Sequence, residues 1–227
     1  MEMEEIFMQR VLLVIGLILI TSSVSWASTC TMGTMATYDA SGFSCTIDDK
    51  TFSAFGYSGT SLAPTAADVN VIPCPSASPF CNQLPAGEEG FVFTAAWLAS
   101  AGQTVDSTLT YHVATSSAGI IDAFLVAAGL GVSGTGSASV AENFVPNVGS
   151  LFVSNATGST DSITFGAVPS LTVVKDIGLN GGNGSAAISL VGNGFSQSQV
   201  PEPASLALLG TALFGAGLLA RRRLSQN

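Results

Sequence analysis

The sequence predicts an all-β fold: a single β-sandwich, jelly-roll-like in its strand order, between two apolar terminal segments. Two observations support this prediction. Across residues 28–196, apolar and polar side chains alternate with period two, and Gly, Asn or Pro interrupts the pattern roughly every 8–12 residues. The same stretch contains no window with the sustained helical period of about 3.6 residues. About ten short strands in one domain imply two packed sheets.

The clearest alternation lies near the middle of the chain. The strand expected at 91–98 carries most of its aromatic residues on one face, so Trp97 is expected in the core. In the strand expected at 108–113, apolar side chains alternate with threonines and His112. Further strands are expected at residues 50–56, 68–72, 120–127, 137–142, 150–154, 162–165, 170–177 and 186–191.

A glycine-rich segment at 129–134 matches the G-x-G-x-x-G pattern of dinucleotide-binding folds. A dinucleotide site requires a helix that opens at this point and an acidic residue about 20 positions further on. The residues that follow are instead typical of a turn and a strand, and no acid stands at 150–155. The segment is therefore interpreted as a β-hairpin turn, like the glycine-rich segment 178–184.

The first 27 residues have the layout of a signal peptide. Residues 11–20 form an unbroken apolar stretch that is too short to span a bilayer. The small-x-small sequence at 25–27 is a cleavage site, which would make Ser28 the first mature residue. The acidic residues before the apolar stretch are atypical of a signal peptide, so translation from Met8 is a second interpretation. An uncleaved N-terminal anchor is a third.

The C-terminal end carries three consecutive features. Pro201, Glu202 and Pro203 are followed by an apolar run over 204–220 and then by Arg221, Arg222 and Arg223. As a transmembrane helix the run would extend roughly 25 Å, enough for a thin hydrocarbon core. The arginines favour a cytoplasmic location for their end, which places the residues before the proline pair on the other side of the membrane. A single-pass anchor that is never cut is the alternative.

In order and spacing, this tail resembles the sorting segment of the bacterial PEP-CTERM family. The resemblance implies that a membrane-embedded exosortase recognises Pro201, Glu202 and Pro203 and cuts the chain near them. It also implies that the arginines at 221–223 act as the stop signal. The body is similar to PEP-CTERM ectodomains of unknown activity. The expected organisation is a signal peptide at 1–27, an ectodomain at 28–196, and a linker with the sorting tail at 197–227.

Between its two ends the chain is acidic. Residues 28–200 hold only two basic side chains, Lys50 and Lys175, against eight Asp and three Glu, a formal charge of −9. Nucleic acid and anionic lipid would repel such a domain, so nucleic-acid binding is not expected. Few charges and many hydroxyl side chains indicate a surface made soluble by hydroxyl groups.

Two acidic pairs, Asp48-Asp49 and Glu88-Glu89, are weak candidates for a calcium site. Adjacent carboxylates on turns usually point apart into water, so solvated loop acids are the first interpretation. Calcium bound by loop carboxylates is the functional alternative, although the spacing of an EF-hand loop is missing. Paired carboxylates could also serve glycoside hydrolysis, which needs two of them about 5–10 Å apart.

Four cysteines, Cys30, Cys45, Cys74 and Cys81, fall in the exported part, and an even number favours disulfides. Three pairings are possible. The sequential pairing is predicted because both of its loops are short and prolines constrain the second. A metal site lacks both CxxC spacing and a supporting histidine.

His112 is the only histidine, so a Ser-His-Asp triad would depend on it. Its place on the threonine face of a strand favours a solvated residue instead. We therefore expect no enzyme, but a non-catalytic cell-surface or extracellular-matrix protein acting in adhesion, biofilm formation or exopolysaccharide association. The alternative is a carbohydrate-binding module or weak glycosidase that uses Trp97, Tyr57 or Tyr111 as stacking platforms.

Overall fold

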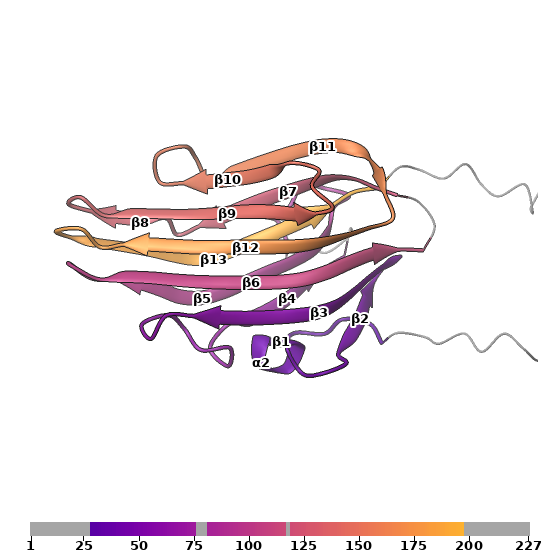
Figure 1. Cartoon of the computed structure of the whole chain (residues 1–227), viewed down its shortest axis with the longest axis horizontal. Coiled ribbons are helices and arrows are strands. Elements are labelled where there is room, and N and C mark those ends of the chain that lie inside the picture. The colour runs from indigo at the N-terminus through magenta and orange to yellow at the C-terminus, as the bar shows by residue number, and fades with distance from the viewer. Residues whose placement is uncertain (1–27, 76–80, 117–118, 198–227) are drawn as a thin grey trace, which may run out of the picture.

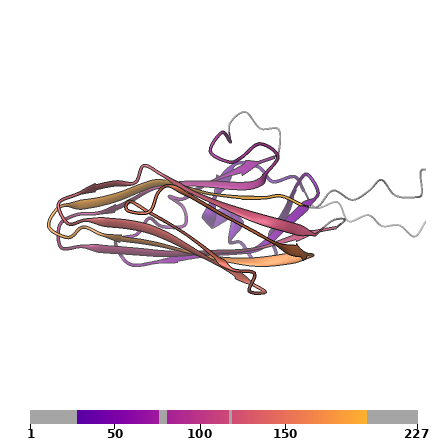
Figure 2. The ribbon, with the colours of Figure 1, turned by 90° about the horizontal axis from the view of Figure 1, so that it is seen from above.

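The computed structural model describes residues 28–75, 81–116 and 119–197, and these form two antiparallel sheets packed face to face (Figure 1, Figure 2). Within these ranges no helix is long and apolar enough to cross a membrane. The expected signal peptide at 1–27 and the expected span at 204–220 lie outside the described residues.

The front sheet in Figure 1 has six strands. In spatial order these are β10 (Ser150–Ser154), β9 (Ser137–Val145), β12 (Ser170–Asn180), β6 (Thr104–Thr115), β3 (Lys50–Gly59) and β2 (Ser44–Ile47). The back sheet has seven. Its order is β1 (Gly33–Thr34), β4 (Asn70–Cys74), β5 (Glu89–Ala99), β13 (Ser185–Phe195), β7 (Ile120–Ala128) and β11 (Thr160–Val168), with β8 (Gly131–Ser133) pairing with β13. One helical turn, α2 (Met35–Tyr38), follows β1.

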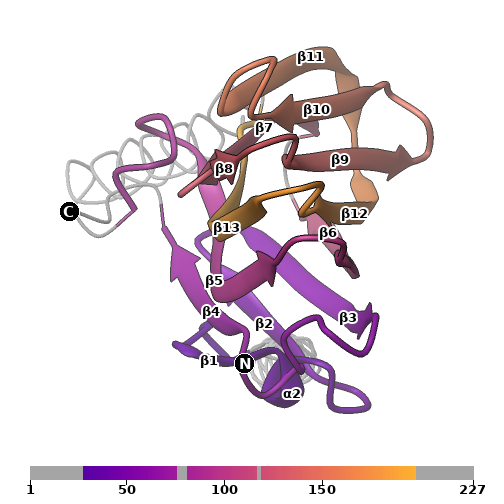
Figure 3. The ribbon, with the colours of Figure 1, turned by 90° about the vertical axis from the view of Figure 1, so that its left-hand side faces the viewer.

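The chain passes from one sheet to the other after β1, β3, β5, β6, β8, β10, β11 and β12. Seen along the strands, the two sheets face each other, with β9, β12, β6 and β3 on one side and β7, β13, β5 and β4 on the other (Figure 3). The prediction of an all-β sandwich is confirmed. The chain of a jelly roll also crosses repeatedly between its two sheets, so this topology is jelly-roll-like in that respect.

Every strand expected from the alternation is present, most of them longer by a few residues at one or both ends. The elements that the alternation missed are α2 and the short strands β1, β2 and β8. The glycine-rich segment 129–134 is not the predicted β-hairpin turn, because the chain continues beyond Gly129 along β13 in the register of β7. Gly129 and Gly134 have φ values of 67° and 58°, which favour glycine, and the short edge strand β8 lies between them.

The core lies between the sheets and is built from the alternating positions. Phe91, Phe93 and Trp97 on β5 are fully buried, as predicted, while Leu98 is 54% exposed. Tyr111 on β6 packs among the same aromatic side chains, with its ring centroid 6.1 Å from that of Phe91. Burial of this apolar surface is the main stabilising contribution to the fold.

A second, smaller apolar cluster lies on the outer side of the back sheet. It contains Cys74, Cys81, Leu84, Val92 and Val126. Val92 is expected on the outward face of β5, yet only 4% of it is exposed. The reason is that Cys74, Cys81 and Leu84 pack with it on this side of the sheet.

Candidate functional site

The predicted acidic pairs meet around one lysine at one end of the sandwich. Lys50 begins β3, and its side chain is buried. Its Nζ donates to Glu89 Oε2 at 2.6 Å and lies 3.5 Å from Asp49 Oδ1. Glu89 begins β5 in the other sheet and is only 8% exposed; burial raises its pKa, and the Lys50 ammonium opposes that shift. An ion pair therefore joins the two sheets at this end.

Glu88 belongs to the same charge cluster. Its side chain lies over Gly194 of β13, where an added Cβ would come within 2.0 Å of Glu88 Oε2. That oxygen is buried and accepts no hydrogen bond within the described part of the chain. Burial raises the pKa of Glu88 to about 8, the charge of Asp122 adds to the shift, and Lys50 opposes it. The carboxyl is therefore mostly protonated at neutral pH.

These positions correct the interpretation of the four acids as solvated loop residues. Asp48 is exposed at its turn, but Glu89 is buried, and Asp49 and Glu89 both face the Lys50 ammonium. Among residues 28–75, 81–116 and 119–197, no group of three or more His, Cys, Asp or Glu side chains is arranged to hold a metal ion. The lysine already places a positive charge beside Asp49 and Glu89.

The end of the ectodomain is tied to this charged end of the sandwich. Gln197 forms a β-bridge with Ile120, and its Oε1 accepts a hydrogen bond from Thr115 Oγ1 at 2.9 Å. The first described residue lies at the same end, since the amide of Thr46 donates to the carbonyl of Ser28 at 2.8 Å. In Figure 1 this is the right-hand end, where β3 begins and β6 ends. The fold thus extends one residue beyond the expected boundary at 196.

A second buried ion pair lies in the middle of the sandwich, and the sequence reasoning missed it. Lys175 on β12 and Glu142 on β9 are cross-strand neighbours, and Lys175 Nζ donates to Glu142 Oε2. Asn193 Nδ2, on β13 of the opposite sheet, lies 2.6 Å and 2.7 Å from the two carboxylate oxygens. All three residues are fully buried. The sequence does contain a sign of this burial. Lys175 lies two residues from each of the core residues Val173 and Ile177, so its side chain points to the same, inward face of β12.

The burial of both lysines determines the charge of the surface. Lys50 and Lys175 are the only Lys or Arg residues between positions 28 and 197, and both are 0% exposed. The outer charges of the described Lys, Arg, Asp and Glu side chains therefore come from Asp and Glu. Such a surface repels anionic polymers.

His112 lies on the outward face of the front sheet, as predicted. Its Nδ1 is 3.2 Å from Thr172 Oγ1 on the neighbouring strand β12, and the ring is half-buried. This histidine is therefore held by a threonine hydroxyl within a flat strand surface.

The outward face of the front sheet is lined with small hydroxyl side chains, and we call it the hydroxyl face. It carries Ser53, Ser58, Thr108, Thr110, Ser139 and Thr172, which lie in adjoining rows of the strand register. Asp176 lies in the same rows; burial raises its pKa, and the charge of Asp106 adds to the shift. The edge strand β10 borders this face. Its Phe152 pairs with Ala141 of β9 in the strand register, and the Phe152 side chain is 48% exposed.

The aromatic residues proposed as stacking platforms do not lie on the surface. Trp97 is fully buried and donates from Nε1 to Ser107 Oγ at 3.2 Å, which confirms its expected place in the core. Tyr111 is also fully buried. Tyr57 is half-buried, and its hydroxyl donates to the carbonyl of Pro64 at 2.9 Å. The proposal of Trp97 and Tyr111 as platforms is wrong, because their strand positions point inward.

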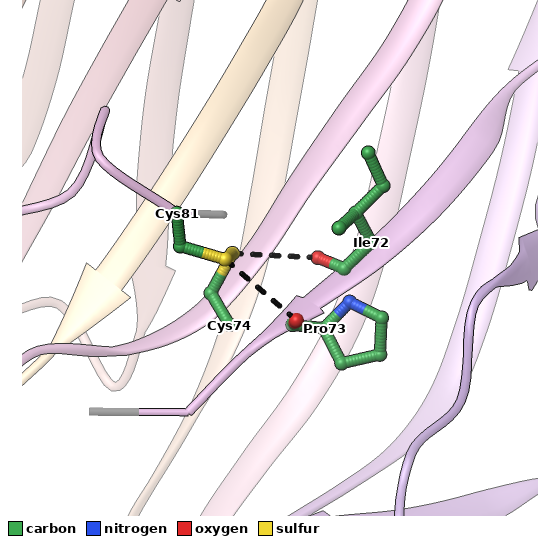
Figure 4. The surroundings of a disulfide bond; sticks show 4 residues. All are labelled: Ile72, Pro73, Cys74 and Cys81. Carbon is green, nitrogen blue, oxygen red and sulfur yellow. Dashed lines mark hydrogen bonds between the residues drawn. A yellow bond between two sulfur atoms is a disulfide. The ribbon is translucent and has the colours of Figure 1, made fainter. Parts of the chain in front are cut away.

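Both disulfides have the predicted sequential pairing, Cys30–Cys45 and Cys74–Cys81. In Figure 4 the sulfurs of the second bridge lie close to two backbone carbonyls, at 3.6 Å from Ile72 O and 3.7 Å from Pro73 O. A disulfide sulfur carries no proton to donate, so these are sulfur–oxygen packing contacts. They hold the bridge against the end of β4.

The predicted sorting residues Pro201, Glu202 and Pro203 and the arginines at 221–223 lie outside the described residues. The PEP-CTERM protein-sorting motif matches the sequence over residues 199–223. No curated protein matches the chain by sequence.

Solved structures resemble the sandwich only distantly. The carbohydrate-binding module TmCBM61, solved with β-1,4-galactotriose, has a TM-score of 0.34 at 13% identity, covering 63% of this chain and 88% of its own. A promiscuous carbohydrate-binding module of the β-sandwich superfamily has a TM-score of 0.27 at 10% identity, covering 77% and 64%. The enzymatically active domain of bacteriophage CBA120 tailspike protein 4 has a TM-score of 0.28 at 13% identity, covering 62% of this chain but 19% of that protein.

Proposed function

We propose that this chain is a non-catalytic component of the cell surface or extracellular matrix, because residues 199–223 match the PEP-CTERM sorting motif of exported proteins. In this proposal a membrane-embedded exosortase processes the chain near Glu202, after a stage in which residues 204–220 anchor the precursor in the inner membrane. The released body then associates with extracellular polysaccharide and contributes to adhesion or biofilm structure.

The observation that carries the proposal is the short distance along the chain between fold and motif. Gln197 is still bonded to the sandwich, and only residues 198–200 separate it from Pro201. Four residue steps span at most roughly 14 Å. The folded body is therefore delivered directly at the site of sorting, which suits a protein whose role is to be placed on the surface.

The composition of the surface supports a passive role in a polysaccharide matrix. The hydroxyl face offers an extended plane of hydroxyl groups, which form hydrogen bonds of modest strength with sugar hydroxyls. Both lysines are buried, so neither lysine ammonium is exposed to attract an anionic polymer. We therefore expect association with neutral polysaccharide and weak or no association with anionic polysaccharide at low ionic strength.

Affinity electrophoresis of the mature protein in gels containing neutral or anionic polysaccharide tests this proposal. The expected result is retardation by neutral polysaccharide that the triple variant Thr108→Val, Thr110→Val, Thr172→Val weakens. Thr160→Val with Thr164→Val on β11, the edge strand of the opposite sheet, is the matched control and should bind as the wild type does. Equal mobility with and without every polysaccharide would remove the polysaccharide role and leave the surface location untouched.

A true carbohydrate-binding module is the second candidate, and one observation favours it. Phe152 is 48% exposed at the edge of the hydroxyl face, where its ring could stack on a sugar. Phe152→Ala should then abolish binding to one defined oligosaccharide. If binding is weak, multivalent and indifferent to this substitution, the passive matrix role is the better account.

A further inference from the structure

Three chemically complementary side chains meet in the buried centre of the sandwich. Lys175 and Glu142 come from neighbouring strands of the front sheet, and Asn193 comes from β13 in the back sheet. Each is 0% exposed. An amine, a carboxyl and a carboxamide are thus enclosed together by the apolar core.

The contacts bring the amine close to the carboxamide. Lys175 Nζ and Asn193 Nδ2 both bond to the same oxygen, Glu142 Oε2, the second at 2.7 Å. Two atoms that share a hydrogen-bond partner lie within about 6 Å of each other. Asn193 Nδ2 also donates to the carbonyl of Phe124 at 3.1 Å, which fixes the orientation of the amide. Its Oδ1 is buried and has no hydrogen-bond partner in the described part of the chain.

We propose that Lys175 and Asn193 join in an intramolecular isopeptide bond in the folded protein, with Glu142 carrying the proton between the two nitrogens.

The reaction balances without an oxidant, a reductant or a further reagent. The lone pair of the neutral Lys175 amine attacks Asn193 Cγ, and the Nζ–Cγ bond forms. Glu142 accepts a proton from Nζ and delivers a proton to Nδ2, because its Oε2 contacts both nitrogens. The Cγ–Nδ2 bond then breaks and ammonia leaves. A secondary amide, ammonia and an unchanged Glu142 carboxyl remain.

The surroundings favour this step in three ways. Burial lowers the pKa of Lys175, although the neighbouring Glu142 opposes the shift, and a lower pKa favours the neutral amine that can attack. The closed core excludes water that would compete with the amine. The fold holds both partners in place, which replaces an encounter in solution by an intramolecular one.

The other buried lysine provides an internal comparison. Lys50 is equally buried and also bonds to a glutamate, but its second neighbour is the carboxylate of Asp49. In the described part of the chain, no carboxamide hydrogen-bonds to its partner Glu89. Ammonia loss is therefore expected at Lys175 and not at Lys50.

The bond would change how the fold carries load. β13 is the last strand before the sorting motif, so tension on the C-terminal end is applied to it first. A link from Asn193 to Lys175 would tie β13 covalently to β12 in the facing sheet. The inference depends only on the core geometry and stands whether or not the proposed matrix function is right.

Mass spectrometry of the full chain, unfolded, reduced and alkylated after purification in its folded form, tests the proposal. We expect the whole population to be lighter than its sequence mass by one ammonia molecule. Trypsin should fail to cut after Lys175 while still cutting after Lys50, and digestion with chymotrypsin should yield one branched peptide containing both Lys175 and Asn193. A chain at full sequence mass, cleaved by trypsin at both lysines, would overturn the proposal.

Ammonia loss has a second source, which the peptide map separates. Asn193 precedes Gly194, and cyclisation of this pair to a succinimide also releases ammonia. A light chain whose Asn193 peptide is unbranched, with Lys175 open to trypsin, would therefore count against the isopeptide bond.

Variants separate a chemical role from a structural one. Lys175→Arg keeps a cation beside Glu142, and Glu142→Gln keeps a hydrogen-bonding group of the same shape, so both are expected to fold and to show full mass. Lys50→Arg is the matched control. It should still lack the mass of one ammonia molecule and still yield the branched peptide that contains Lys175 and Asn193. Complete branching in Glu142→Gln would overturn the role of Glu142. Should either variant fail to fold, the wild-type mass and branched peptide alone decide.

Discussion

Asp122 holds Ser196 by both of its carboxylate oxygens, immediately after the last strand ends. The amide of Ser196 donates to Asp122 Oδ1 at 2.7 Å, and the Ser196 hydroxyl donates to Oδ2. In return, the carbonyl of Ser196 accepts a hydrogen bond from the amide of Ile121 at 3.1 Å. This clamp sets where the fold stops and where the segment leading to the sorting motif begins.

Removing the clamp should loosen the end of the chain. Asp122→Ala deletes two hydrogen bonds to a carboxylate, each typically worth about 1.5–3 kcal/mol. We expect faster amide exchange at Ser196, measured by hydrogen–deuterium exchange, and a free energy of unfolding lower by about 3 kcal/mol or more. Ser196→Ala keeps the backbone bond and should lose less. Unchanged exchange at Ser196 in Asp122→Ala would show that the clamp does not hold this segment.

Glu88 should make the protein less stable as the pH rises. Its pKa is about 8 in the fold, above its ordinary value, because of burial and then the charge of Asp122. The folded protein therefore holds this proton over a range in which the unfolded chain has lost it. The stabilisation is complete below the ordinary pKa of a glutamate and disappears as the pH approaches 8.

Glu88→Gln removes this titration and supplies a permanently neutral side chain of similar shape. The melting temperature of the variant relative to the wild type should increase between pH 5 and pH 8 and level off above pH 8. Leu98→Ala, at an exposed position without a titratable group, is the control and should show no such trend. A constant difference between Glu88→Gln and wild type at all pH values would contradict the assignment.

The two disulfides should contribute unequally. The bridge Cys30–Cys45 closes a separation of 15 residues, whereas Cys74–Cys81 closes one of 7. Chain-entropy arguments give about 3 kcal/mol for the first and about 2 kcal/mol for the second. Urea unfolding of the two paired Cys→Ser variants measures both values. Loss of the second bridge should also increase binding of a hydrophobic dye, because its two cysteines pack with Val92 and Val126 on the outer side of the back sheet. No increase in dye binding would show that Val92 and Val126 stay covered without the bridge.

Trp97 should act as a core residue. Trp97→Ala is expected to lower the free energy of unfolding by about 3–5 kcal/mol, because the indole is fully buried. Leu98→Ala, at the adjacent position, should change it by less than about 1 kcal/mol, because that side chain is 54% exposed. Chemical denaturation of both variants measures the contrast. A stable Trp97→Ala protein would place the indole outside the core.

The alternation of apolar and polar residues was sufficient to predict the sandwich, the buried place of Trp97 and the outward place of His112. The alternation did not predict the charged side chains that are buried between the sheets. Glu89 was expected in water because it follows a turn, yet the facing sheet brings Lys50 to it. Asn193 reaches Glu142 only across the space between the sheets. Such contacts depend on how two sheets pack, and no local pattern in one strand carries that information. The disulfide pairing was predictable because short loops limit the choice.

The central claim is that this body is delivered across the membrane and released from a temporary tail. The most direct test is the intact mass and terminal sequence of the protein recovered from the cell surface or medium. The account predicts a chain that begins at Ser28 and ends near Glu202, and that keeps its tail in cells without exosortase or with Glu202→Ala. An untrimmed chain of 227 residues, recovered from the cytosol in every strain, would contradict it.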